Sequence, residues 1–143
     1  MLVIVGHGPS IEGCDLGDFI DSHKVCRLRR ANVNSDVGFR TDIVCSSQIR
    51  YKRKGKGFWY LSGALRDLCV DMLRPFDPNF VKPSTGLSAC IIARDKGYTS
   101  LGLLGFDYTL HPDKKQNWRH DQFAEYECLM NLGIEIEELN VRP

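Results

Sequence analysis

The stretch MLVIVGHGPS (residues 1–10) decides how the rest of the chain is interpreted. Its apolar run stops abruptly at a turn, which is typical of a strand buried on both faces in a parallel sheet. Gly6 and Gly8 permit backbone angles closed to other residues, and Ser10 can cap a following helix. A strand, a glycine turn and a helix start can present N–H groups to a phosphate. The stretch therefore indicates either a phosphate-binding loop or only a tight turn, and its spacing does not match the dinucleotide fingerprint.

Apolar strands and helical patterns alternate along the remainder of the chain. This alternation predicts an α/β fold: a single domain over residues 1–143, Rossmann-like and three-layered, with a mostly parallel sheet. The aromatic residues 58–60 are expected only to pack or stack. Strands are expected at 2–5, 25–28, 42–45, 101–105 and, at a sheet edge, 134–136. Helices are expected at 62–73, at 87–94 and from Asn117 or His120 onward. The apolar stripe of the last helix is expected to consist of Phe123, Tyr126, Leu129 and Met130.

Composition limits the classes of function. The chain is 43% hydrophobic and 26% charged, with a formal net charge of +1, so nothing drives it as a whole toward nucleic acid or membrane. No apolar run reaches membrane-spanning length, and the first residues form a strand without a basic leader, so a cytoplasmic protein with no membrane partner is expected. The six cysteines form no C-x-x-C pair and mostly sit in apolar runs, which favours reduced, buried thiols over disulfides or a metal site.

Polar clusters follow several of the predicted strands. In an open α/β sheet, ligands bind beyond the carboxyl ends of the strands. Two helix starts rich in hydroxyls and glycines would suit a phosphate and a ribose there. Ser84 is equally a normal helix cap, and Asp107 with Tyr108 an ordinary turn. The clusters are Gly6 to Ser10, which includes His7, then Ser46 with Ser47, Asp107 with Tyr108, and the helix start Ser84, Thr85 and Gly86.

Two histidines are candidates for acid–base chemistry. His120 and Glu125 lie about 140° apart around a helix, so they cannot form the same-face pair of a zinc helix, and no metal site is expected. At the helix start, the dipole would keep His120 neutral and usable as a base; the alternative is a surface histidine. Glu125, one turn later, would then be a structural anchor. His111, in the polar loop after Tyr108, is a second candidate for proton transfer or phosphate contact.

A basic run extends from Arg50 to Lys56 (RYKRKGK). It can be a solvated loop, or an arm that contacts a phosphorylated or polyanionic ligand.

Several stretches, in order along the chain, resemble the sialylmotifs of animal-type sialyltransferases. The spacing of His120 and Glu125 has the form of the short final motif. GFDY at 105–108 also resembles the corresponding stretch of bacterial sialyltransferases. The other matching stretches are VGHGPS (5–10), IDSH with V-x-R (20–27) and DVGFRT (36–41), which are similar to the long motif L, and PSTG (83–86) with LLGF (103–106), which are similar to motif S.

The resemblance implies a metal-independent, inverting glycosyltransferase without a cofactor, using a nucleotide-activated, CMP-linked sugar. His120 would take the proton from the acceptor hydroxyl, and Tyr108 or His111 would donate a hydrogen bond to the departing phosphate, with Glu125 in the catalytic set. The implied nucleotide-binding residues are Gly6, His7, Gly8, Ser10, Arg27, Arg29, Ser47, Ser84, Thr85, Gly86 and Asp107.

Two residues depart from the family pattern. His7 stands where the family usually has Asn, and Arg29 replaces a second nucleotide-contacting Asn with a longer, charged donor. These departures keep two further hypotheses open. One is a nucleotide-binding module without catalysis. The other, motivated by the basic run, is a glycosyltransferase that acts on nucleic acid.

Overall fold

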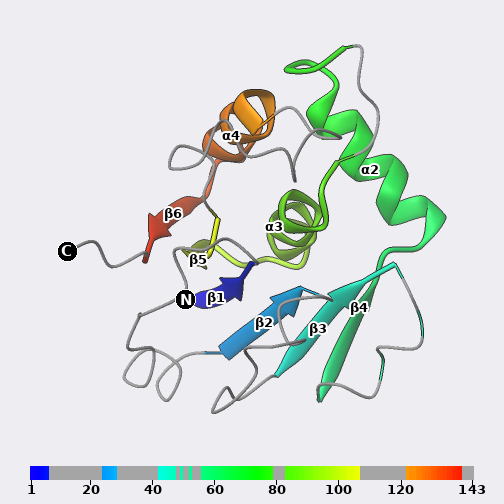
Figure 1. The fold of residues 1–143 in the computed structure, drawn as a ribbon. Helices are drawn as coiled ribbons and strands as arrows, with labels where there is room; N and C mark the ends of the chain where they lie inside the picture. Colours follow the sequence, from blue (N-terminus) through cyan, green and yellow to red (C-terminus); the bar gives the residue numbers. More distant parts are fainter. Residues whose placement is uncertain are drawn as a thin grey trace.

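The computed structural model describes residues 1–6, 24–28, 42–47, 49, 52, 56–78, 83–106 and 122–139 (Figure 1). For residues 24–28 and Gln122 it describes the backbone alone. Six strands form one sheet in the order β4-β3-β2-β1-β5-β6, and every neighbouring pair is parallel. The strands are β1 (Leu2–Val5), β2 (Lys24–Leu28), β3 (Ile43–Ser46), β4 (Gly57–Tyr60), β5 (Ser100–Leu104) and β6 (Glu135–Glu138). The predicted α/β class with a mostly parallel sheet is confirmed.

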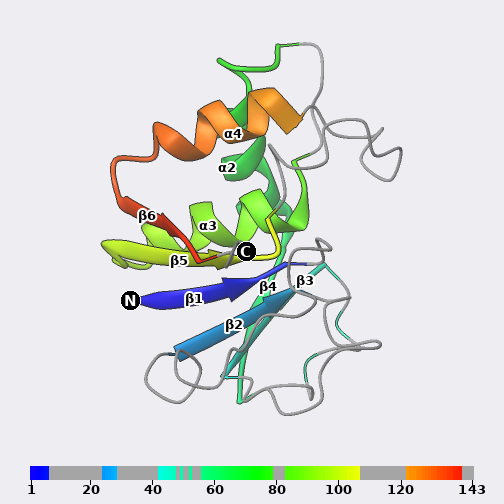
Figure 2. The same ribbon diagram turned by 60° about the vertical axis from the view of Figure 1, so that its left-hand side comes forward.

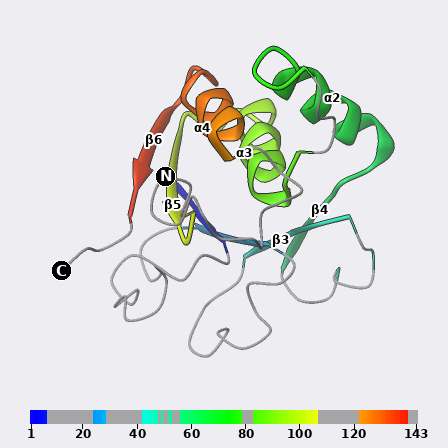
Figure 3. The same cartoon turned by 45° about the horizontal axis from the view of Figure 1, so that its top comes forward.

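In the described part of the chain, three helices accompany the sheet: α2 (Gly63–Leu73), α3 (Thr85–Asp95) and α4 (Gln122–Met130). Serine side chains cap the first two, because Ser62 accepts a hydrogen bond from the Leu65 N–H and Ser84 accepts one from the Leu87 N–H. All three helices lie on the same face of the sheet, with α3 packed across β1, β2 and β3 (Figures 1 and 3). The second helical layer of the predicted arrangement is not among the described residues.

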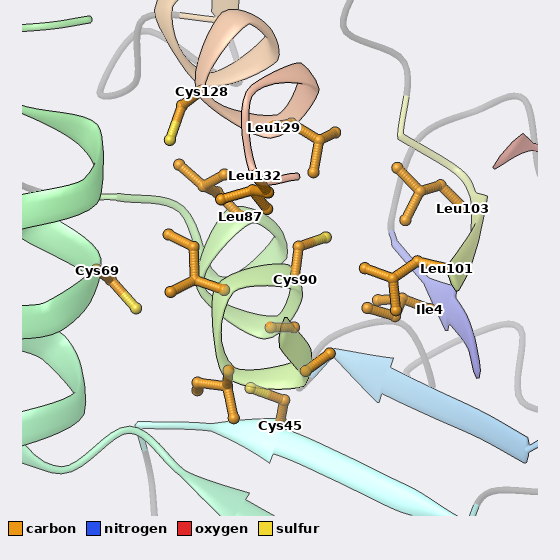
Figure 4. Close-up of a cluster of buried hydrophobic side chains, with 14 of the residues drawn as sticks. Ile4, Cys45, Cys69, Leu87, Cys90, Leu101, Leu103, Cys128, Leu129 and Leu132 are labelled. Carbon is orange, nitrogen blue, oxygen red and sulfur yellow. The ribbon is translucent and has the colours of Figure 1, made fainter. Parts of the chain in front are cut away.

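The core forms around α3 and the central strands. Leu87, Cys90 and Ile91 of α3 meet Leu2 and Ile4 of β1 in one buried cluster (Figure 4). Val3 and Val5, which alternate with them along β1, are also fully buried. Both faces of β1 are therefore covered, as its unbroken apolar run predicted. No helix of the described part is long and apolar enough to cross a bilayer.

Two predicted details need correction. Residues 57–60 form the edge strand β4, which the sequence patterns did not indicate. The predicted stripe of the last helix is also wrong in part, because Phe123 and Met130 are exposed by 65% and 44%. The buried face of α4 is instead formed by Ala124, Glu125, Cys128 and Leu129, so a carboxylate faces inward where an apolar residue was expected.

Candidate nucleotide site at the carboxyl edge of the sheet

The strand order reverses between β1 and β5. From β1 the chain continues to β2 on one side, whereas β5 lies on the other side and continues to β6. Ligands of open α/β sheets bind at such a switch point, outside the carboxyl ends of the strands. Here those ends are Gly6, which follows β1, and Gly105 with Phe106, which follow β5.

The two strand ends are held in close backbone contact. The Gly6 N–H donates to the Leu104 carbonyl at 2.7 Å. A Cβ atom on Gly6 would lie 2.8 Å from the Gly105 carbonyl oxygen and 3.1 Å from the Phe106 ring. Gly105 has a φ of +72°, which favours glycine. Gly6 is thus required by the close approach of two backbones, a role additional to the phosphate contact that the sequence predicted.

Helices α3 and α4 both begin at this edge. Each leads through a short connection into a strand, α3 into β5 and α4 into β6, so each runs opposite to the strands (Figure 2). Their N-terminal ends therefore lie toward the carboxyl ends of β1 and β5. N-terminal turns offer unpaired N–H groups and the positive end of the helix dipole. The edge combines these turns with the glycine contact described above.

A buried carboxylate joins the two helix starts. Glu125 of α4 is only 1% exposed. Its Oε2 accepts a hydrogen bond from the Ser84 N–H at 2.8 Å, and its Oε1 accepts one from the Ser84 hydroxyl at 2.5 Å. The same Ser84 oxygen accepts from the Leu87 N–H at 3.1 Å. The carboxylate therefore lies at the positive end of α3, where a negative charge is favourable.

This link, called the Ser84–Glu125 clasp below, changes which donors are free at the start of α3. Both donors of Ser84 are used by Glu125, whereas the N–H groups of Thr85 and Gly86 have no acceptor within the described residues. Thr85 is half-buried and Gly86 is buried. The clasp is the contact expected of Glu125 as a structural anchor. The nucleotide-binding role of Ser84 and the catalytic role of Glu125 stay predictions.

Two of the remaining predicted residues, Ser47 and Arg27, belong to the described part of the chain. Ser47 is half-buried and directly follows β3, at the same edge. Phe106, which was not predicted as a site residue, is buried beside Gly6, and the glycine that precedes it was the available signal. Arg27 is described only as part of the β2 backbone. The predicted residues outside the described part are His7, Gly8, Ser10, Arg29, Asp107, Tyr108, His111 and His120.

Cysteine thiols from three neighbouring elements lie around α3 in the core, and α3 itself contributes another (Figure 4). They come from β3 (Cys45), α2 (Cys69), α3 (Cys90) and α4 (Cys128), and all are free and buried. Burial raises the pKa of Cys45 to about 12 and that of Cys128 to about 11, and it also raises the pKa of Cys69 and Cys90. These thiols stay protonated at neutral pH and are poor nucleophiles. Among the described residues, no group of side chains could hold a metal ion.

The raised thiol pKa values predict a loss of stability at alkaline pH. Above about pH 9, thiols ionise in the unfolded chain but stay protonated in the folded protein, so the folded state binds more protons and stability falls as pH rises. For Cys45 the loss continues to its folded pKa of about 12. Each such thiol contributes about 1.4 kcal/mol per pH unit inside its window. Urea unfolding of the wild type and of Cys45→Ala from pH 8 to 11 measures this, and the variant should show the shallower decline. Equal slopes would contradict the assignment.

No protein-family model and no curated protein matches this chain. Among solved structures, a mutant of the α-2,3/8-sialyltransferase CstII has a TM-score of 0.59 at 14% identity, over 97% of this chain and 81% of that chain. CstII from Campylobacter jejuni in complex with cytidine-5′-monophosphate has a TM-score of 0.56 at 14% identity, over 97% and 79%. A CstII complex with a trisaccharide acceptor and CMP has a TM-score of 0.56 at 13% identity, over 97% and 80%.

These similarities define the class of fold. The chain has a sialyltransferase-like α/β fold, as the sequence resemblance implied. The structures reported above are those of the sialyltransferase CstII, and the likeness to them does not test the animal-type sialylmotifs.

Proposed function

We propose that this protein is a glycosyltransferase that transfers a sugar from a CMP-linked donor to an acceptor hydroxyl. The observation that carries the proposal is the likeness over 97% of the chain to sialyltransferase structures, two of which contain CMP. The geometry supports it independently. Two helix N-termini and the glycine contact of the switch point lie at one edge of the sheet, where α/β proteins bind nucleotides.

The nucleotide phosphate is assigned to the first turn of α3. The Thr85 and Gly86 N–H groups lack a protein acceptor in the described residues, and they are the donors that a phosphate oxygen would accept from. Glu125 lies at the same helix end, where each of its two oxygens accepts a hydrogen bond from Ser84. Gly6 would allow the ligand to approach the β1 backbone without a side chain in the way.

The chemistry assigned to the site is an inverting, metal-independent transfer. His120 lies two residues before α4, whose start is at the ligand edge, and would act as the base that removes the acceptor proton. The acceptor oxygen then forms a bond to the anomeric carbon while the bond to the nucleotide phosphate breaks. Tyr108 or His111 would donate a hydrogen bond to the departing phosphate, where negative charge grows. These three roles derive from the sequence resemblance.

The proposal is tested by CMP binding and by one backbone substitution. CMP present at 100 times its Kd should stabilise the protein by about 2.7 kcal/mol in thermal unfolding. Thr85→Pro removes one N–H at the first position of α3, where proline is well tolerated, and Ser84 already has the extended backbone (φ −65°, ψ 160°) that a following proline requires. A hydrogen bond to a charged group contributes about 1.5–3 kcal/mol, so Thr85→Pro should weaken CMP binding at least about tenfold.

Two matched variants complete this test. Thr85→Ala keeps the N–H and should keep the affinity for CMP. Gly63→Pro makes the same backbone change at the first position of α2, whose cap Ser62 has the same extended conformation (φ −67°, ψ 168°), and should not affect CMP binding. If no nucleotide shifts the unfolding temperature, the site assignment is wrong. CMP binding without transfer from any CMP-linked sugar would instead favour the nucleotide-binding module without catalysis.

A further inference from the structure

The two edges of the sheet carry opposite charges. On one edge, β6 has three glutamates in four residues (Glu135, Glu137 and Glu138), all exposed. The segment from Gln122 to Leu139, which forms α4 and β6, contains no lysine or arginine. On the other edge, β4 follows the run 50–56, which holds five lysines and arginines, and the described members Lys52 and Lys56 are exposed. The molecule therefore has an acidic β6 edge and a basic β4 edge.

Each edge also presents backbone groups that no described strand uses. On β4, the N–H groups of Gly57 and Leu61 donate inward to Asp42 and Ser46 of the β3 segment. Because alternate residues of a strand point to opposite sides, the backbone groups of Phe58 and the N–H of Tyr60 point outward, whereas the Tyr60 carbonyl accepts from the Ser62 N–H at 2.9 Å. On β6, the N–H groups of Glu135 and Leu139 donate inward to Thr99 and Leu103.

The same alternation turns the backbone groups of Ile136 and Glu138 outward. β6 thus also has an outer ladder that no described strand uses, and exposed strand edges of this kind are templates for a further strand.

Exposed apolar side chains accompany both edges. Apart from Met1, the large exposed hydrophobic residues of the described part form two pairs. Tyr60 of β4 is 44% exposed, and Ile49, in the connection from β3 to β4, is 61% exposed. Phe123 and Met130 lie on α4, which leads into β6 on the opposite side of the molecule (Figure 1). Each edge thus has charged residues and backbone groups that no described strand uses, with exposed apolar residues on β4 and on the elements that lead into β4 and β6.

We propose that copies of this chain associate head to tail, with the β6 edge of one copy beside the β4 edge of the next. The charges of the two edges determine which edge of a second copy can pair with each of them. Two acidic edges repel one another, as do two basic edges, so a symmetric dimer through either edge is disfavoured; only β6 with β4 brings opposite charges together. Because all strands are parallel, a β6–β4 pair continues the sheet in the same direction. Such a heterologous contact forms a ring if it closes and an open chain if it does not.

The association is reversible and sensitive to salt. β4 and β6 have four residues each, so each junction contains a short ladder. Exposed charges are screened by salt within about 8 Å at physiological ionic strength. Sedimentation velocity over a hundred-fold range of concentration should therefore show growth beyond the monomer at low salt. At high salt the onset should move to several-fold higher concentration.

Two charge-reversal variants test the geometry. Variant A carries Glu137→Lys and Glu138→Lys. Variant B carries Lys52→Glu, Lys54→Glu and Lys56→Glu, which leaves two arginines and three glutamates in the run 50–56. Each alone has two edges of the same sign and should remain monomeric. Mixed, the β6 edge of A meets the β4 edge of B and the β6 edge of B meets the β4 edge of A. Both junctions bring opposite charges together, so growth beyond the dimer should return with A and B alternating. A symmetric contact through a single edge would instead stop at a 1:1 heterodimer of A and B, which would contradict the head-to-tail arrangement.

Matched controls separate edge charge from total charge. Asp67→Lys with Asp71→Lys on the exposed surface of α2 changes the net charge as variant A does, and should assemble like the wild type. Circular dichroism and thermal unfolding of each variant verify folding. A wild type that stays monomeric at low salt throughout the concentration range overturns the proposal, as does assembly of variant A alone. Binding of the basic edge to a polyanion with no self-association would also overturn it.

Discussion

Glu125→Ala is expected to lower the free energy of unfolding by about 3 kcal/mol. The substitution removes a buried carboxylate that accepts from both the N–H and the hydroxyl of Ser84. Hydrogen bonds to a charged acceptor contribute about 1.5–3 kcal/mol each, and the Ser84 N–H would be left without a partner. The loss also includes the favourable charge at the start of α3.

Urea unfolding measures this effect, and Glu127→Ala is the matched control. Glu127 lies on the same helix, two residues further on, but it is exposed, so its replacement should change stability by less than about 0.5 kcal/mol. Ser84→Ala removes the partner hydroxyl and the cap of α3. Because Ser84 and Glu125 share one interaction, the double variant should be less destabilised than the sum of the two single variants. Additive losses would contradict the clasp.

Gly6→Ala is expected to destabilise the protein by about 2–3 kcal/mol, at the upper end of what an added methyl group costs in a packed interior. The new Cβ would lie 2.8 Å from the Gly105 carbonyl oxygen, a backbone atom that cannot rotate away, and 3.1 Å from the Phe106 ring. The ends of β1 and β5 must therefore move apart. If the nucleotide binds at this switch point, affinity for CMP should fall as well.

Two other glycines serve as controls in the same unfolding experiment. Gly102→Ala on β5 would meet mainly the end of the Leu139 side chain, which can adjust, so its cost should be smaller than that of Gly6→Ala. Gly63 is the first residue of α2, and a Cβ atom there would have no other atom within 4 Å. Gly63→Ala should therefore leave stability unchanged or slightly improved. Equal effects at Gly6 and Gly63 would show that the close contact is not the cause.

The sequence predicted the central strands and the helix caps because their signals are local. The apolar run of β1 is buried on both faces, and Ser62 and Ser84 cap helices that begin at the next residue. Strand β4 was missed because a half-buried edge strand made of consecutive aromatic residues has no alternation. The buried face of α4 was predicted incorrectly because the apolar residues Phe123 and Met130 were assigned to it. In the structure both are exposed, and Glu125 is buried instead.

The candidate site was predictable only in separate parts. Ser84, Thr85, Gly86 and Glu125 were each named from the sequence, but the hydrogen bonds between Ser84 and Glu125 join residues 41 positions apart. Neither helical spacing nor composition records such a pairing. The close contact of Gly6 with Gly105 is likewise tertiary, because it depends on β5 lying directly beside β1.

The Ser84–Glu125 clasp has a consequence for how a ligand would be received. One residue donates to both oxygens of one carboxylate, which fixes the orientation of the first turn of α4 against that of α3 as well as their separation. The spacing between these two turns is therefore set by the protein before any ligand arrives. A molecule that contacts both turns meets them already positioned, so none of its binding free energy is spent on ordering them. The receiving edge is preorganised.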